Sequence, residues 1–147
     1  MAFVLGCILM LLTLVVQTIG VTVLIDWLRA VVLREFSYGG NVHAATLVLR
    51  TTIALLVLHG LTILLWAACY RWIYFPSWAS AFYFSGSTYA TVGYGDVVLP
   101  PQWRTLAPME SLVGVLMCGL SVSIMFALIQ RFVSQEDASS SAPNTPQ

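Results

Sequence analysis

Three long uncharged stretches constrain what this chain can fold into. Ala2–Ile25, Thr51–Tyr70 and Ser111–Gln130 contain no aspartate, glutamate, lysine or arginine. A helix needs about 20 predominantly apolar residues to cross the hydrocarbon core of a bilayer, and each stretch is long enough. Only 8% of the 147 residues are charged, too few for the surface of a soluble domain. The sequence therefore predicts an all-α membrane protein with three transmembrane helices in a lipid bilayer.

The first stretch stands where a secretory signal peptide would stand. It lacks a basic segment before the apolar run, and no small-residue cleavage site precedes Asp26, so we expect a retained helix. Residues 26–45 mix apolar with charged side chains. This pattern predicts an amphipathic cytoplasmic linker at the membrane interface, ended by a glycine-containing turn over residues 38–41. Residues 1–46 would form an N-terminal unit of helix and linker.

The segment between the second and third stretches is too broken to be a simple span. It runs from Pro76 to Pro101 and contains aromatic residues and glycines. Ser77 suits an N-cap position. A helix over Trp78–Tyr89 would cross roughly half a membrane at ~1.5 Å per residue. The negative end of its dipole would favour a cation near the membrane centre, so we expect a re-entrant pore helix.

The residues after this predicted helix read Thr91-Val92-Gly93-Tyr94-Gly95-Asp96. This order matches the selectivity-filter signature of the potassium channel family, and residues 47–133 resemble that family's pore domain of outer helix, pore helix, filter and inner helix. The resemblance implies passive conduction of K⁺ as the permeant ion, with no other cofactor. It also implies a homotetramer with cyclic symmetry, because one chain supplies one strand of the filter.

The resemblance also implies a mechanism for the filter. The backbone carbonyls that replace the water of K⁺ would come from Thr91, Val92, Gly93 and Tyr94, with the Thr91 hydroxyl at the inner end, and Gly95 completes the ion-binding filter. The backbone must alternate between ordinary and left-handed conformations, which Gly93 and Gly95 allow without a Cβ clash. Val92 would pack toward the pore helix, and Tyr94 would enter an aromatic cuff.

Side chains around the filter are assigned by the same resemblance, which places Tyr83, Phe84, Ser87 and Asp96 at the filter and its outer mouth. Four copies of Asp96 would form a negative ring that concentrates cations, or Asp96 would hydrogen-bond to Tyr83, or both. Tyr83 and Phe84 would hold the filter open. Relatives often have Trp at the Tyr83 position and Thr at the Ala90 position, and some have a carboxylate at the Ser87 position. The stability and inactivation of the filter therefore do not follow from the resemblance.

The third stretch carries the candidate gate. By resemblance Gly119 is a hinge of the inner helix, while helix packing by Gly114 and Gly119 is an equally open interpretation. Ser123 and Ala127 share a face with Gly119 at i, i+4 spacing. We expect this face to line the inner cavity.

Three further ionisable residues have structural interpretations. Glu110 lies where the third helix starts, and the positive end of the helix dipole favours a carboxylate there. Arg104 would pair with Glu110 or with Asp96. His59 lies inside the second stretch, and we favour an interhelical hydrogen-bond partner over a pH sensor.

Arginine placement predicts the orientation in the membrane. Arg71 and Arg104 lie on the filter side, and the opposite side holds Arg29, Arg34, Arg50 and Arg131. The positive-inside rule makes the second set cytoplasmic. The filter mouth and the N-terminus would then face outward and the C-terminus the cytoplasm. The exclusive use of arginine as basic residue fits a GC-rich coding sequence, and so a bacterial inner membrane.

Two surface features complete the predicted organisation. An aromatic belt is expected near the outer surface, formed by Trp66, Trp72, Trp78 and Trp103. The segment 134–147 is rich in serine and proline and is expected to be a disordered tail.

The rest of the sequence argues against other classes of function. It contains no hydrolase triad, phosphate-binding loop or zinc-ligand spacing, so no enzyme is expected, and its zero net charge does not favour nucleic acid. No repeated Arg-x-x-Arg pattern indicates a voltage sensor. The cysteines at positions 7, 69 and 118 are expected to be buried free thiols. Besides the potassium-selective channel, two alternatives stay open: a non-conducting regulatory membrane subunit, and a weakly selective cation channel, which Tyr94-Gly95 disfavours.

Overall fold

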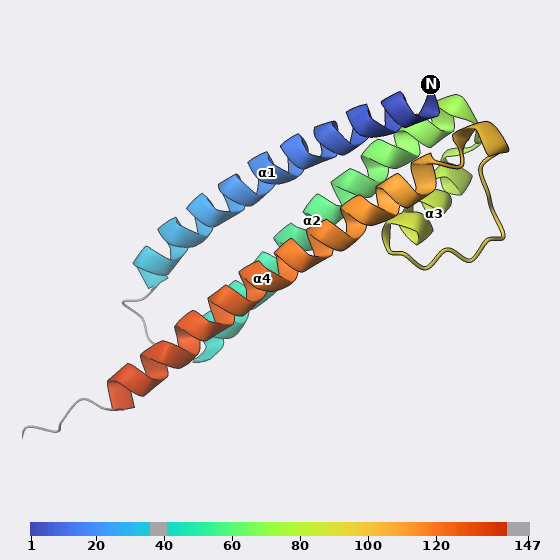
Figure 1. The fold of residues 1–147 in the computed structure, drawn as a ribbon. Helices are drawn as coiled ribbons and strands as arrows, with labels where there is room; N and C mark the ends of the chain where they lie inside the picture. Colours follow the sequence, from blue (N-terminus) through green and yellow to red (C-terminus); the bar gives the residue numbers. More distant parts are fainter. Residues whose placement is uncertain (36–40, 141–147) are drawn as a thin grey trace, which may run out of the picture.

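The structure is a computed structural model that describes residues 1–35 and 41–140 (Figure 1). Its helices are α1 (Ala2–Glu35), α2 (Asn41–Ile73), the short α3 (Trp78–Tyr89) and α4 (Leu106–Ser140), with a 3-10 turn, η1 (Pro101–Trp103). The described ranges contain no strand. Three helices are long and apolar enough to cross a membrane, over Ala2–Val31, Ala44–Ile73 and Pro101–Ser134. The predicted all-α fold with three transmembrane helices is confirmed.

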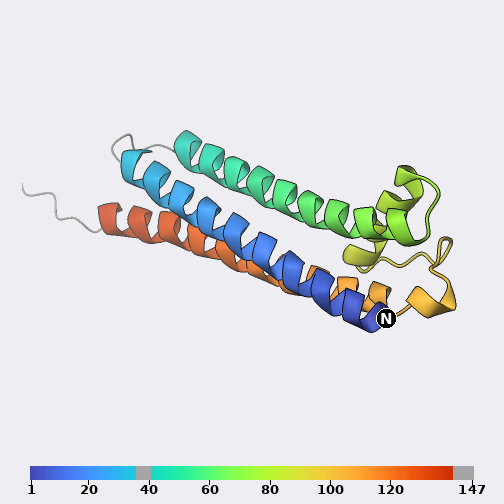
Figure 2. The ribbon, with the colours of Figure 1, turned by 90° about the horizontal axis from the view of Figure 1, so that it is seen from above.

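The long helices run side by side in alternating directions, as both ribbon views show (Figures 1 and 2). α1 starts at the end of the bundle where α3 lies, α2 returns to that end, and α4 leads away from it. The N-terminus and the loop over residues 90–105 therefore share one end, and α4 finishes at the other. Arg71 lies in the last turn of α2 and Arg104 just before α4, so both belong to the loop end.

Two helices extend further than the sequence indicated. Residues 26–35 continue α1 and residues 41–45 already belong to α2, so the predicted amphipathic linker is helical at both ends; positions 36–40, with most of the predicted turn, lie outside the described ranges. No glycine or proline interrupts the chain between Gly20 and Gly39. Residues 134–140 are likewise helical and not disordered, because the next proline is Pro143, while 141–147 lie outside the described ranges.

The main hydrophobic core lies at the loop end of the bundle. Its buried members come from all four helices and the connecting loops: Leu9, Trp66, Ala67, Tyr70, Phe75, Ala81, Phe84, Leu99 and Leu106. The placement of Trp66 in an aromatic belt is wrong, since its side chain is fully buried. Its indole N–H donates to the Thr13 hydroxyl of α1 at 3.0 Å. Trp72 and Trp78, by contrast, are exposed, as a belt requires.

α1 packs on both α2 and α4 through small and polar residues. Gly6 lies against the side chain of Met109 on α4, and Gly20 lies against Leu58 on α2, so that no side chain larger than hydrogen fits at either glycine without displacing its neighbour. Gln17 is buried, and its carbonyl oxygen accepts a hydrogen bond from Thr62 at 3.4 Å. These contacts join α1 to the other helices in one packed bundle.

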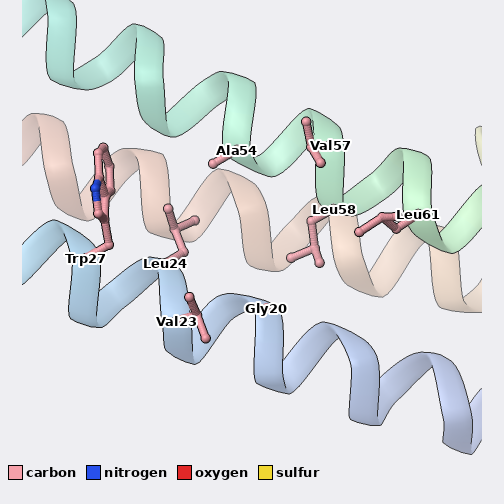
Figure 3. A pocket seen from close by; sticks show the side chains of 8 residues that line it. All are labelled: Gly20, Val23, Leu24, Trp27, Ala54, Val57, Leu58 and Leu61. Atoms are coloured by element: carbon pink, nitrogen blue, oxygen red, sulfur yellow. The ribbon is translucent and has the colours of Figure 1, made fainter.

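An open apolar groove of about 260 Å³ lies between α1 and α2 and includes the contact of Gly20 with Leu58 (Figure 3). It is lined by Gly20, Val23, Leu24, Trp27, Ala54, Val57, Leu58 and Leu61. All of these residues lie inside the membrane-spanning parts of the two helices. Their apolar side chains suit the hydrocarbon of a bilayer.

The three cysteines are free, as expected. Their predicted burial is wrong, because Cys7 and Cys69 are only partly buried and Cys118 is exposed. Cys118 lies on α4, where no neighbouring helix of the same chain covers it.

Candidate ion-conduction site

The short helix α3 is placed by its cap and by its buried face. The Ser77 hydroxyl accepts a hydrogen bond from the Ser80 amide at 3.2 Å, which confirms the predicted N-cap. The helix bounds, Trp78–Tyr89, are those expected from the sequence. Its buried residues are Ala81, Phe84, Ser85, Thr88 and Tyr89. This face packs against α2 and α4, so the end of α3 has a defined position.

The C-terminal end of α3 is fastened to α4. The Ser111 hydroxyl donates to the Thr88 carbonyl at 2.8 Å. A Cβ at Gly114 would overlap the carbonyl oxygen of Tyr89, so glycine is required for this close approach. Gly114 is therefore a packing contact. Gly119, by contrast, has no atom within 4 Å of the position of a Cβ. The packing interpretation fits Gly114 and not Gly119 within one chain.

His59 joins three helices next to this contact. Its Nδ1 lies 2.8 Å from the Tyr89 hydroxyl on α3, and its Nε2 lies 2.9 Å from the Ser121 hydroxyl on α4. The Tyr89 ring meets the imidazole edge-on at 5.8 Å between centroids. The expectation of an interhelical hydrogen-bond partner is confirmed.

The backbone after α3 alternates in conformation. Thr91, Gly93 and Gly95 have φ of 60°, 55° and 78°, whereas no other described residue has a positive φ. The alternation expected from the two glycines is present and includes Thr91. A left-handed conformation costs a residue with a Cβ of order 1–3 kcal/mol and persists only where the surroundings impose it. Thr91 is such a residue, and the sequence pattern alone did not single out its backbone.

Hydrogen bonds to the last turn of α3 impose this conformation. The Thr91 amide donates to the Thr88 carbonyl at 3.0 Å. The Ser87 carbonyl accepts from the amides of Val92 at 2.9 Å and Gly93 at 3.2 Å. The Ser87 hydroxyl turns back to the Phe84 carbonyl at 3.0 Å. Ser87, predicted as a filter support, thus acts through its backbone, and any shift of α3 moves the segment 91–93.

The outer part of the segment is held by Tyr83. Its hydroxyl donates to Asp96 Oδ2 at 2.8 Å, and its ring stacks on that of Tyr94, with centroids 6.5 Å apart and an interplanar angle of 8°. The hydrogen bond to Asp96 holds the pKa of the Tyr83 phenol above its ordinary value. Of the two roles considered for Asp96, the contact with Tyr83 is confirmed.

Phe84 contacts both the core and the surroundings of the segment. Its ring lies 5.0 Å from Tyr70 and 5.3 Å from Phe75 between centroids, and it also lines the hollow beside Thr91 and Tyr94. Arg104 and Glu110 do not pair as considered from the sequence. Arg104 donates to the Leu99 carbonyl at 3.3 Å. The contacts of Glu110 are instead with hydroxyl groups of α2 and α3.

A comparison with known protein families bears on this arrangement. A family model described as an ion channel matches residues 40–131. The chain belongs to this ion channel family. The match corresponds to a two-span pore domain of the potassium-channel type and confirms the family resemblance. No curated protein and no solved structure matches the chain.

The matched range contains most of the described helices of this ion channel. The match covers α2, α3, the segment 91–96 and α4 as far as Arg131, and α1 lies outside it. Within the described ranges, no group of three or more His, Cys, Asp and Glu side chains could hold a metal ion. The oxygen atoms of residues 91–96 are those of the backbone and of the Thr91, Tyr94 and Asp96 side chains.

Much of the channel segment and of the inner helix is uncovered within one chain. Val92 and Tyr94 are 51% and 71% exposed. Gly119, Ser123 and Ala127 on α4 are exposed as well, with the Ser123 hydroxyl donating to the Gly119 carbonyl at 2.9 Å. An open hollow of about 300 Å³ adjoins the segment, and its lining includes Thr91, Gly93 and Tyr94 together with Pro108 and Ser111 of α4.

Proposed function

We propose that this ion channel is potassium-selective and conducts K⁺ passively through a filter formed by residues 91–95 of four identical chains. The observation that carries the proposal is the positive φ at Thr91, Gly93 and Gly95 inside the sequence Thr-Val-Gly-Tyr-Gly. This alternation is what a strand needs if successive carbonyls are to point the same way. Carbonyl oxygens then replace the hydration shell of the ion.

The surroundings of the segment support selective conduction. The Ser87 carbonyl holds the inner part through two amides, and Tyr83 holds the outer part through Asp96 and Tyr94. A filter held at both ends keeps its oxygens at fixed spacing. The Thr91 hydroxyl would bind K⁺ at the inner end, and four Asp96 carboxylates would raise the local cation concentration at the mouth.

A homotetramer is part of the proposal. One chain supplies one strand, and a pore needs strands on all sides. The exposure of Val92, Tyr94 and the face of Gly119, Ser123 and Ala127 within one chain supports this assembly. In the tetramer the α4 face would line the inner cavity below the filter. Gly119, free of packing neighbours, would be its hinge.

The proposed channel lies in a cell membrane, with a bacterial inner membrane as the expected location. The loop end, with Arg71 and Arg104, would face outward, and the opposite end, with Arg29, Arg50 and Arg131, the cytoplasm. The N-terminus would share the outer side, and the C-terminus would be cytoplasmic.

The test is ion flux from liposomes that contain the purified protein, under potassium and then sodium gradients, with barium as blocker. Potassium-driven, barium-sensitive flux is expected. Gly93→Ala should abolish it, because alanine at a φ of 55° is strained by about 1–2 kcal/mol. Gly60→Ala is the matched control, since Gly60 lies in α2 with open space around its Cβ position.

Each other result of this experiment contradicts the proposal. Equal sodium flux would indicate a weakly selective cation channel. No flux from a confirmed tetramer, under varied pH and voltage, would favour a non-conducting regulatory subunit.

A further inference from the structure

A buried carboxyl group lies in the early turns of α4, next to the pore helix. Glu110 has no exposed surface. Its Oε2 accepts a hydrogen bond from the Tyr70 hydroxyl of α2 at 2.7 Å, and its Oε1 contacts the Ser85 hydroxyl of α3. A buried carboxylate is costly unless a positive charge or several donors compensate it. Through its two contacts Glu110, which lies on α4, joins α4 to α2 and α3.

The arginines at this end of the bundle bond elsewhere. Arg104 donates to the Leu99 carbonyl, and Arg71 donates to the Phe75 carbonyl at 3.2 Å. Three titratable groups on the surrounding helices interact electrostatically with Glu110: Cys69 and Tyr70 on α2 and Tyr89 on α3. Thiol and phenol groups are neutral at pH 7. On the α1 side, Gly6 lies against Leu106 and Met109, which precede Glu110 on α4, and glycine has no titratable side chain.

The number of protons in this cluster indicates the state of the carboxyl group. The Ser85 hydroxyl lies 2.9 Å from the Ile63 carbonyl of α2 and also contacts Glu110. The carbonyl can only accept, and a serine hydroxyl has one hydrogen to donate. The three contacts, Tyr70 to Glu110, Glu110 to Ser85 and Ser85 to Ile63, need three protons. Tyr70 and Ser85 supply one each, so the third belongs to Glu110.

We infer that Glu110 is a neutral carboxylic acid that positions α3 and, through it, the filter. It accepts from Tyr70 and donates to Ser85, which donates to the Ile63 carbonyl. Ser85 lies two residues before Ser87, whose carbonyl holds the amides of Val92 and Gly93. Loss of this link frees α3 to shift and disturbs the filter geometry. The consequence for selectivity depends on the proposed potassium function, whereas the neutral state of Glu110 does not.

The protonation state is tested by infrared spectroscopy on the purified tetramer in liposomes at neutral pH. The wild type should show the carbonyl stretch of a protonated carboxylic acid, and Glu110→Gln should lack it. The matched control is Asp26→Asn, which removes a carboxylate 68% exposed to solvent and should leave the band unchanged. Identical wild-type and Glu110→Gln spectra in this region would overturn the inference, whatever the protein conducts.

The positioning role is tested by the potassium-to-sodium flux ratio at equal tetramer yield. Glutamine offers a neutral acceptor and donor, so Glu110→Gln should keep the ratio, whereas Glu110→Ala should lower it by about tenfold through unpaired hydroxyl groups. Raising the pH, while keeping it below the range in which Tyr83 ionises, should lower the wild-type ratio and leave that of Glu110→Gln unchanged.

Failures of the two hypotheses are distinguishable. A wild type without potassium selectivity contradicts the proposed function, and the infrared result still decides the state of Glu110. A selective wild type with an unselective Glu110→Gln tetramer would mean that a charge is required, and this would overturn the inference. An unchanged ratio in Glu110→Ala would overturn the positioning role. If Glu110→Ala does not assemble, Glu110→Gln and the alkaline arm decide it.

Discussion

The imidazole Nδ1 of His59 lies 2.8 Å from the hydroxyl of Tyr89. Tyr89 ends α3, two residues before the first residue of the filter segment, and the other imidazole nitrogen reaches Ser121 on α4. Ser121 lies two residues after Gly119, the proposed hinge. One side chain of α2 thus contacts both the last residue of α3 and the middle of α4.

We predict that His59→Ala destabilises the tetramer and His59→Gln does so less, because glutamine can still bond to one of the two hydroxyls. Interhelical hydrogen bonds in membranes contribute about 0.6 kcal/mol on average and up to about 2 kcal/mol. Thermal melting of the purified tetramer measures the effect. Tyr89→Phe combined with His59→Ala should cost less than the sum of the single changes. Strict additivity would mean that the contact contributes nothing.

Removal of the Tyr83 hydroxyl should weaken the proposed filter without abolishing conduction. Tyr83→Phe deletes the hydrogen bond to Asp96 and keeps the ring stacked on Tyr94. The contact is exposed and water competes for it, so its loss should speed the loss of flux during incubation in low potassium by roughly a few-fold. Time-resolved liposome flux measures this rate.

Tyr74→Phe is the matched control for this change, because it removes a hydroxyl from a half-exposed tyrosine at the same end of the bundle. Its rate should equal that of the wild type. A wild-type rate in Tyr83→Phe would show that the contact with Asp96 does not hold the filter. Because the pKa of Tyr83 is raised, the protective contact should persist at neutral pH and weaken only as pH rises through that raised value.

The two glycines of α4 should respond differently to the same substitution. Gly114→Ala places a methyl group on the Tyr89 carbonyl, and overpacking of this kind costs about 1–3 kcal/mol. Gly119→Ala meets open space within the chain, so the tetramer should remain as stable as the wild type while channel opening is reduced. Tetramer yield and melting temperature measure the first effect, and flux measures the second. Equal stability losses at both positions would contradict this assignment.

The face of α4 that lines the proposed cavity is accessible to a chemical test. Cys118 is exposed, so the experiment starts from a variant in which the native cysteines are replaced by serine. Ser123→Cys should then make flux sensitive to a charged thiol reagent inside the liposomes. Val122→Cys is the control, because the neighbouring residue on a helix points about 100° away. Inhibition at position 122 and none at position 123 would show that another face lines the cavity.

Several features of the channel could be predicted because they depend on local chemistry. The lengths of the uncharged stretches required spanning helices, and Ser77 marked the start of α3. The alternation of glycine in the segment 91–95 predicted left-handed backbone at Gly93 and Gly95. Tyr83 and Asp96 both lie near the segment 91–95 in sequence. A contact between them could therefore be proposed as one of two roles for Asp96.

Other features depend on which helices meet in space. The burial of Trp66 follows from α1, whose Thr13 accepts its indole N–H, and nothing in the residues around Trp66 indicates that neighbour. Glu110 was expected to interact with its own helix dipole and lies instead between hydroxyl groups from α2 and α3, more than twenty residues away in sequence. Arg104 bonds to a nearby carbonyl and to neither of the carboxyl groups considered.

The sequence by itself determined the membrane class, the short helix α3 and the left-handed backbone at Gly93 and Gly95, because charge, capping and glycine conformation act within a few residues. Only the tertiary structure decided which glycine of α4 packs, which carbonyl holds the amides of Val92 and Gly93, and which side chains bridge the helices. Such contacts depend on the relative placement of distant segments, since a hydrogen bond forms only within about 3 Å. A one-dimensional pattern does not contain that placement.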